Sequence, residues 1–134
     1  MSGITMTGRL FTLTRQNALT GIESTLFLNH LHTQVSRKLL VIWDGSPIHR
    51  ADTVKSFLLN GGGKFVHLER LPAYAPDLNP DEGTWNYLKY VEMRNLCCLN
   101  LQHLHCHLNL AITRLRRKSS VIQSFFSAAG LSLF

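Results

Sequence analysis

The stretch LLVIWDG, residues 39–45, decides the fold of this chain. Its apolar residues follow one another without a polar interruption until Asp44 and Gly45 end the run. Such a run is typical of a strand that is buried on both faces in the sheet of an α/β protein. We therefore expect Asp44 at the carboxyl end of a central strand, where functional sites of open α/β sheets assemble.

The segments before this strand have the patterns of a hairpin and a helix. Residues 1–14 alternate partly between apolar and polar positions around two glycines, which predicts an antiparallel hairpin. Thr20 and Glu23 have the spacing of a capping box. Apolar residues then recur at helical spacing, which predicts a helix to about Ser36 that packs on a sheet.

Helical and extended patterns also alternate after the strand. Apolar spacing predicts a helix over residues 50–60, which consecutive glycines end, and a short strand over residues 65–68. Three prolines within residues 71–80 disfavour a helix in this segment. Asn79 is a good N-cap, so we expect a new helix to begin there. In that helix we expect three apolar residues to face the core: Trp85, Leu88 and Val91. A long helix over residues 101–118 and a short one through Phe126 follow.

This alternation of strands and helices predicts an α/β fold with one sheet covered by helices, in a single domain over residues 1–134. The chain has a net charge of +6, which favours a polyanionic partner such as nucleic acid. No apolar run approaches the roughly 20 residues of a membrane helix, and three clustered cysteines do not form a paired disulfide framework. We expect a cytoplasmic protein with no membrane partner.

Two acidic residues have positions that suit a metal site. Asp44 ends the buried strand, and Glu82 lies in the first turn of the helix after the next strand. Paired carboxylates bind hard cations such as Mg²⁺ or Mn²⁺, which promote phosphodiester cleavage. Both residues also have a structural interpretation: Glu82 as part of a capping box with Asn79, and Asp44 as an ordinary turn residue.

The residues around these acids form two long motifs. WDGSPIHR, residues 43–50, and LPAYAPDLNPDEGTWNYLK, residues 71–89, resemble the segments that carry the second and third catalytic acids of DDE transposases. The resemblance is to the mariner-like superfamily, in particular its bacterial insertion-sequence branch, and it covers at least residues 38–118. One departure is Gly45, where the family commonly has Asn.

The resemblance implies a ribonuclease H-like mixed sheet flanked by helices, with Asp44 and Glu82 as catalytic ligands of Mg²⁺ or Mn²⁺. It implies cleavage and strand transfer at transposon ends, a DNA partner, a dimer when active and a nucleoid-associated location. No Asp precedes Asp44, and Glu23 has a capping position. We therefore expect the chain to lack the first strand and the first acid, which a missing segment or a second chain would supply together with a helix-turn-helix.

Several basic residues are candidates for DNA contact, although cations also favour helix C-termini for electrostatic reasons. The candidates are His49, Arg50, Lys89, Arg114, Arg116, Arg117 and Lys118. His49 has two interpretations, contact with phosphate or orientation of the Asp44 loop. A different class of function is a catalytically inert DNA-binding or protein-interaction remnant of a mobile element. A third is a zinc-stabilised domain built on the cysteines and histidines of residues 97–107, whose spacing matches no standard zinc finger.

Overall fold

The computed structural model describes residues 1–131, which form two compact units. The first unit contains Met1 and residues 12–75, and the second contains residues 2–11 and the described chain from Pro76 onward. Helices and a pair of strands occur in both units. The mixed α/β fold class predicted from the sequence is therefore confirmed.

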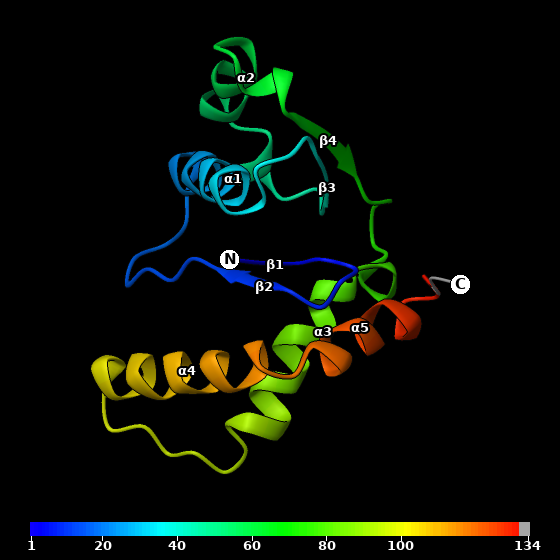
Figure 1. Ribbon diagram of the computed structural model, residues 1–134. Coiled ribbons are helices and arrows are strands. Elements are labelled where there is room, and N and C mark those ends of the chain that lie inside the picture. Colours follow the sequence, from blue (N-terminus) through cyan, green and yellow to red (C-terminus); the bar gives the residue numbers. More distant parts are fainter. Residues whose placement is uncertain (132–134) are drawn as a thin grey trace. The chain divides into compact units, whose positions relative to one another are not determined.

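The first unit is built from two helices and two parallel strands. Thr20 caps the first helix, and the predicted capping box with Glu23 is present. Ser36 ends that helix in the left-handed conformation, at φ 54°. The elements, which Figure 1 shows with β3 and β4 side by side, are α1 (Gly21–Val35), β3 (Leu39–Trp43), η1 (Pro47–His49), α2 (Asp52–Leu59), η2 (Gly62–Lys64) and β4 (Val66–Arg70).

The register between β3 and β4 places the ends of both strands together. Leu39 pairs with Val66 and Trp43 pairs with Arg70. One face of this strand pair joins the core of the first unit, in which Leu28 of α1 and Val54 of α2 are buried. The Asp44 loop therefore begins where both strands have just ended.

The prediction that β3 is buried on both faces was wrong. Leu40 and Ile42 are 62% and 55% exposed, whereas Leu39, Val41 and Trp43 pack against the core. Alternate side chains of a strand point to opposite faces, and only one face of β3 is packed against helices of its unit. The expected single sheet is likewise divided within residues 1–131, because hydrogen bonds pair β1 with β2 and β3 with β4.

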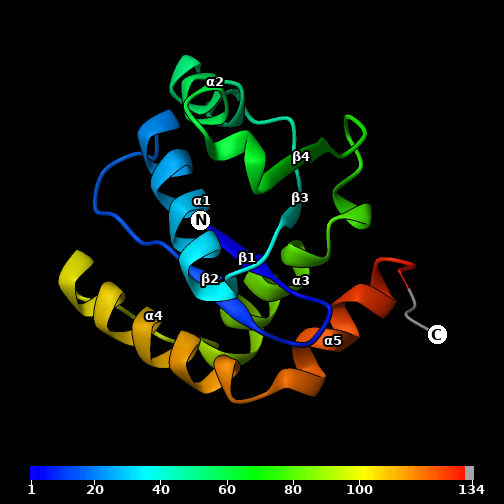
Figure 2. The same cartoon turned by 45° about the horizontal axis from the view of Figure 1, so that its top comes forward.

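The second unit combines a hairpin with three helices. Residues at its start form the predicted hairpin, in which Gly8 has a φ of 85°. Asn79 caps the next helix as expected, and Pro80 is its first residue. The elements are β1 (Ser2–Ile4), β2 (Leu10–Thr12), η3 (Pro76–Leu78), α3 (Pro80–Tyr87), η4 (Leu88–Glu92), α4 (Leu101–Arg116) and α5 (Ser119–Ala128). Figure 2 shows α3 next to β1 and α5, with which it is in contact.

A π-helical segment, η4, corrects the prediction for the face of α3. Trp85 and Leu88 pack in the core of the second unit, but Val91 is 56% exposed. The amide of Met93 donates to the carbonyl of Leu88, which is the wider spacing of a π-helix. The extra residue in this turn rotates Val91 away from the core.

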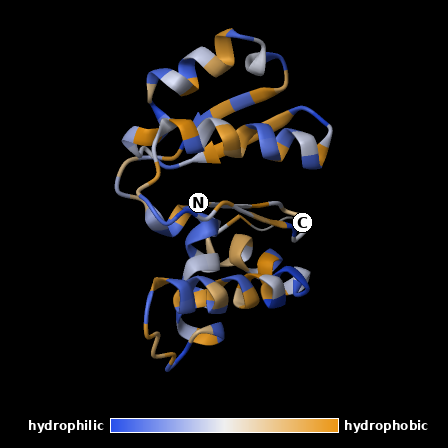
Figure 3. Ribbon diagram, turned by 90° about the vertical axis from the view of Figure 1, so that its left-hand side faces the viewer, coloured by the Kyte–Doolittle hydropathy of each residue, from blue (hydrophilic) through white to orange (hydrophobic). Residues whose placement is uncertain are grey.

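Amphipathic helices supply most of the core of the second unit. Ala111, Ile112 and Leu115 of α4 are almost fully buried, whereas Leu101 near the start of the same apolar stripe is 69% exposed. Figure 3 shows hydrophobic and hydrophilic segments alternating along the helices of both units. Within residues 1–131, no helix combines the length and apolar character required to cross a membrane.

Candidate functional site

Asp44 lies directly after β3, with 57% of its side chain exposed. Its Oδ1 accepts a hydrogen bond from the amide of Ser46 at 2.9 Å, so the structural role of a turn aspartate is present. Its second oxygen, Oδ2, makes no hydrogen bond or ion pair with the residues described. The turn therefore fixes one oxygen of the carboxylate and leaves the other open to solvent.

His49 faces the same oxygen of Asp44. Its Nε2 lies 3.3 Å from Asp44 Oδ1, and only 12% of the His49 side chain is exposed. The imidazole stacks on the Trp43 ring, with 4.2 Å between the ring centroids and 13° between the planes. Burial lowers the pKa of His49, and the charge of Asp44 partly opposes this shift. The Nε2 atom therefore faces the carboxylate at close range without a hydrogen bond between the two groups.

Ser24 is a residue that sequence reasoning missed. Its Oγ lies 3.3 Å from Nδ1 of His49, on the side of the ring away from Asp44. The order Ser24, His49, Asp44 is that of a nucleophilic triad, but Ser24 is completely buried, so no substrate reaches its hydroxyl. The serine instead holds the imidazole. A signal was present, because Ser24 lies on the same helical face as the buried Leu28 and Leu31.

Glu82 lies in the first turn of α3 and is exposed. The Asn79 side chain accepts a hydrogen bond from the amide of Asp81 at 3.1 Å, and the Glu82 side chain does not complete a capping box. Its carboxylate has no hydrogen bond or ion pair with any residue in the described part of the chain. Glu82 therefore does not have the capping role that its spacing allowed, whereas Glu23 does complete a capping box.

The neighbouring Asp81 is a second residue that was missed. Its Oδ2 accepts a hydrogen bond from Ser2 Oγ at 2.5 Å, which ties β1 to the start of α3. Its Oδ1 is buried without a hydrogen-bond partner. Burial raises the pKa of Asp81, and the charge of Glu82 acts in the same direction. Nothing in the spacing of the motif distinguishes this buried acid from the exposed Glu82 beside it.

The predicted DNA-contacting cations near the end of α4 differ in their surroundings. Glu92, with 7% of its side chain exposed, accepts from Arg114 Nε at 2.6 Å and from Lys118 Nζ at 2.7 Å. Arg116 Nε donates to the carbonyl of Leu10 at 3.2 Å. Three of the four cations predicted at residues 114–118 therefore stabilise the second unit through these contacts.

The remaining predicted cations lie on the surface. Arg117 follows the last residue of α4 and is exposed. Lys89 is exposed in η4, with Nζ 5.1 Å from the centre of the Tyr90 ring. Arg50 follows η1 and is also exposed. An exposed cation without a carboxylate partner is available to a phosphate.

The donor chemistry of the two acids suits a hard divalent cation, since carboxylate oxygens are the ligands that Mg²⁺ and Mn²⁺ take in proteins. Asp44 belongs to the first unit and Glu82 to the second, so their convergence stays a prediction. Among residues 1–131 no group of three or more metal-ligating side chains is assembled. In residues 97–107 the three cysteines are free, and His103 and His107 lie 2.7 Å apart through their Nε2 atoms.

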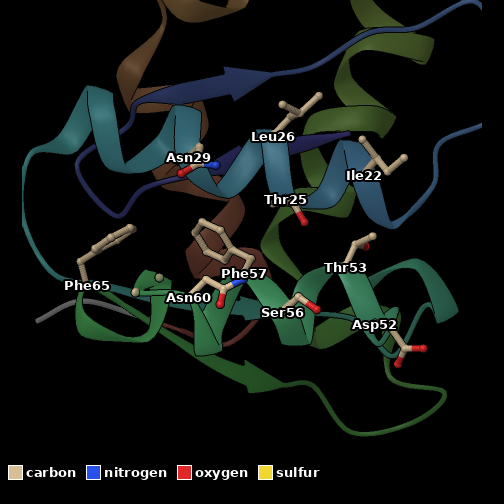
Figure 4. Close-up of a pocket in the computed structure, with 12 residues that line it drawn as sticks. Ile22, Thr25, Leu26, Asn29, Asp52, Thr53, Ser56, Phe57, Asn60 and Phe65 are labelled. Atoms are coloured by element: carbon tan, nitrogen blue, oxygen red, sulfur yellow. The ribbon is translucent and has the colours of Figure 1, made fainter.

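A separate hollow lies between α1 and α2 in the first unit, with a volume of about 780 Å³. Figure 4 shows the Phe57 ring between the two helices, with Leu26 and Ile22 of α1 on the opposite wall. Neither Asp44 nor His49 lines this hollow. Its lining surface is mainly apolar, and Asp52 is the one charged residue among those that line it, so the paired carboxylates of a metal site are not present there.

Comparison with known proteins identifies the family. The family model described as DDE superfamily endonuclease matches residues 1–100, which include both acids and both motifs. Neither the curated proteins nor the solved structures yielded a match. Small sheets flanked by helices agree with the predicted ribonuclease H-like fold. The match spans well over half of the chain, which therefore belongs to the DDE superfamily endonucleases.

Proposed function

We propose that this chain is part of the catalytic domain of a mariner-like DNA transposase, which cleaves DNA at transposon ends and transfers the strand to target DNA. One observation carries the proposal. Within the family match, Glu82 is an exposed carboxylate with no partner in the described structure, and Asp44 is fixed through one oxygen only. Acids with purely structural roles, such as Glu23 and Glu92, are engaged by neighbours instead.

Asp44 and Glu82 are the residues that would hold Mg²⁺ or Mn²⁺. A divalent ion at that place would supply Lewis-acid stabilisation of the charge that develops during phosphodiester cleavage. This chemistry needs positioned carboxylates and no protein nucleophile. The hydroxyl that contacts His49, that of Ser24, is fully buried, which agrees with this requirement.

His49 acts as a positioning residue for Asp44. Its ring is held by the stack on Trp43 and by the Ser24 hydroxyl, and its Nε2 faces Asp44 Oδ1. With Oδ1 bonded to the Ser46 amide and facing His49, Oδ2 is the oxygen available to a cation. Groups that orient a metal ligand in this way commonly change metal affinity or activity by roughly 10- to 100-fold when removed.

A third carboxylate would come from a further segment or a second chain. In the sequence before Asp44, Glu23 is the one acidic residue, and its carboxylate accepts hydrogen bonds from the amide and the hydroxyl of Thr20. Exposed cations such as Arg50, Lys89 and Arg117 would contact phosphates of the DNA partner. We also propose that the active form is a dimer and that end recognition uses a helix-turn-helix outside this chain.

Manganese titration of the ¹⁵N-labelled chain tests the central claim, because paramagnetic Mn²⁺ broadens the signals of nearby amides. We expect the amide signals of Gly45 and Gly83 to broaden together at the same Mn²⁺ concentration. Asp44→Asn and Glu82→Gln should each remove both effects. Glu69→Gln, which changes an exposed acid that contacts His67, is the matched control and should leave both effects in place. Broadening that Asp44→Asn removes at Gly45 alone would show two separate sites and overturn the proposal.

The second candidate function is a catalytically inert DNA-binding or protein-interaction remnant of a mobile element. The observation in its favour is that residues 1–131 assemble no group of three metal-ligating side chains. This candidate predicts salt-sensitive association with DNA that neither Mn²⁺ nor Glu82→Gln alters. Metal-dependent plasmid nicking, after a segment with the third acid has been joined to the chain, would exclude it.

A further inference from the structure

Arg70 lies directly against the loop that carries Asp44. It is the last residue of β4 and pairs with Trp43, and the amide of Leu71 donates to the carbonyl of Trp43 at 2.8 Å. A Cβ at Gly45 would lie 2.5 Å from Nη2 and 2.7 Å from Nε of Arg70. The guanidinium therefore occupies the space that a side chain at position 45 would need.

This guanidinium has no partner within the described residues. It is exposed, and no hydrogen bond or ion pair joins it to another side chain or to the backbone of residues 1–131. The adjacent Glu69 contacts His67 at 2.8 Å, and the Oδ1 atom of Asp44 is used by Ser46 and His49. Two opposite charges thus lie at one edge of the strand pair without forming an ion pair with each other.

An exposed guanidinium without a partner among residues 1–131 suits an anionic ligand. Arg offers a planar fork of N–H donors, which matches two oxygens of one phosphate. The chain is basic overall, and a polyanion is the partner that its charge favours.

We propose that Arg70 binds a phosphate of the DNA backbone next to Asp44, and that the absence of a side chain at Gly45 keeps the place for its guanidinium. The assignment rests on the proposed function, because it makes DNA the ligand at this edge. A larger residue at position 45 would push the guanidinium away from the loop.

Binding of a fluorescently labelled DNA duplex in EDTA, followed by anisotropy over a range of salt concentrations, tests the assignment. Arg70→Gln should weaken binding roughly 5- to 10-fold at about 0.1 M salt and reduce the slope of log K against log salt by about 1. The matched control is Arg37→Gln, which removes an exposed charge near the start of β3. It should change the affinity and the slope much less. Arg70→Lys should keep the slope and lose part of the affinity, because it retains the charge without the fork.

Gly45→Ala completes a double-mutant cycle. The methyl group meets the flexible end of Arg70, so the protein should fold normally, as circular dichroism would show, with the guanidinium displaced. Gly45→Ala should weaken binding in the wild-type background and have almost no effect together with Arg70→Gln. Additive effects, equal effects of Arg70→Gln and Arg37→Gln, or no DNA binding by the wild-type chain would each overturn the assignment. EDTA removes divalent metal, so this experiment measures the contribution of Arg70 to DNA binding alone. A failure of metal binding at Asp44 and Glu82 would be detected separately, by the Mn²⁺ titration.

Discussion

The two acids of the family motifs have opposite kinds of local support. Asp44 is held by its neighbours, since the Ser46 amide bonds to Oδ1 and the His49 imidazole faces the same oxygen. Glu82 has no such contact, and its position comes from the backbone of α3, whose first turn is anchored by the buried Asp81. The second unit thus fixes a backbone and leaves the side chain free, whereas the first unit fixes the side chain itself.

This difference has a physical consequence for a two-ligand site. A ligand that is already oriented loses little conformational entropy when it binds a cation, but a free glutamate loses rotamer freedom at that moment. Substitutions near Asp44 should therefore affect the orientation of a ligand. Substitutions near Glu82 should affect mainly the stability of the helix that presents it.

The largest expected effect follows removal of either ligand. In a chain completed with a third acid, Glu82→Gln and Asp44→Asn should each lower the rate of DNA nicking by on the order of 100-fold or more, because each removes a carboxylate charge from the metal site. Plasmid nicking with Mn²⁺ measures this, and unchanged thermal unfolding shows that the fold survives. Full activity of either variant would contradict the assignment of that acid.

The next effect tests the anchoring of α3. Asp81→Ala should destabilise the second unit by about 1–3 kcal/mol, because it leaves the Ser2 hydroxyl without its acceptor. Asp81→Asn should cost less, since the amide keeps an acceptor and burial already disfavours the charged carboxylate. Urea denaturation measures both values, and an equal loss for the two variants would show that the hydrogen bond does not matter.

A smaller effect tests the orientation of Asp44. His49→Ala should weaken Mn²⁺ binding by roughly 10-fold, because it removes a group that faces the ligand oxygen. The NMR titration gives the affinity. Ser24→Ala, which removes only the hydroxyl behind the ring, should weaken binding less than His49→Ala does. If His49→Ala left the Mn²⁺ affinity unchanged, the conclusion that neighbouring side chains orient Asp44 but not Glu82 would be wrong.

The smallest effect is a dependence of stability on acid pH in the second unit. Hydrogen bonds from Lys118 and Arg114 hold the pKa of Glu92 below its ordinary value of 4.5. Above this pH the carboxylate is ionised in both states and its contribution is complete. As the pH falls below 4.5 through the folded-state pKa, the unfolded chain binds more protons and the contribution is lost.

We expect a contribution of about 1 kcal/mol from Glu92, because the two cations that it binds are about half exposed and are screened by solvent. Denaturation curves between pH 7 and pH 3 should show a smaller loss of stability for Glu92→Gln than for the wild type. Equal losses would assign the acid sensitivity to other groups.

Much of the secondary structure could be predicted because its signals are local. The capping box of Thr20 and Glu23 and the N-cap at Asn79 each depend on side chains within a few residues of the helix start. The positions of both candidate acids at element ends followed from the same reasoning. The family motifs then linked the two positions, and the family match includes both.

Features that depend on contacts distant in sequence were not predictable. Ser24 meets His49 because α1 packs close to η1, and Arg70 reaches Gly45 because β4 pairs in register with β3. The exposure of Leu40 and Ile42 also follows from packing, since an apolar run looks the same whether one face or both are covered. No local sequence pattern predicted the π-helical turn that exposes Val91.

That wide turn gives the second unit one place where the loss of a residue can be absorbed. A π-helical turn holds one residue more than an α-helical turn, so a deletion between the Leu88 carbonyl and the Met93 amide would return the segment to ordinary α-helical bonding. The deletion would have to spare Leu88, which is buried in the core, and Glu92, which binds Arg114 and Lys118. A family of such chains can therefore vary in length here while its core contacts stay the same.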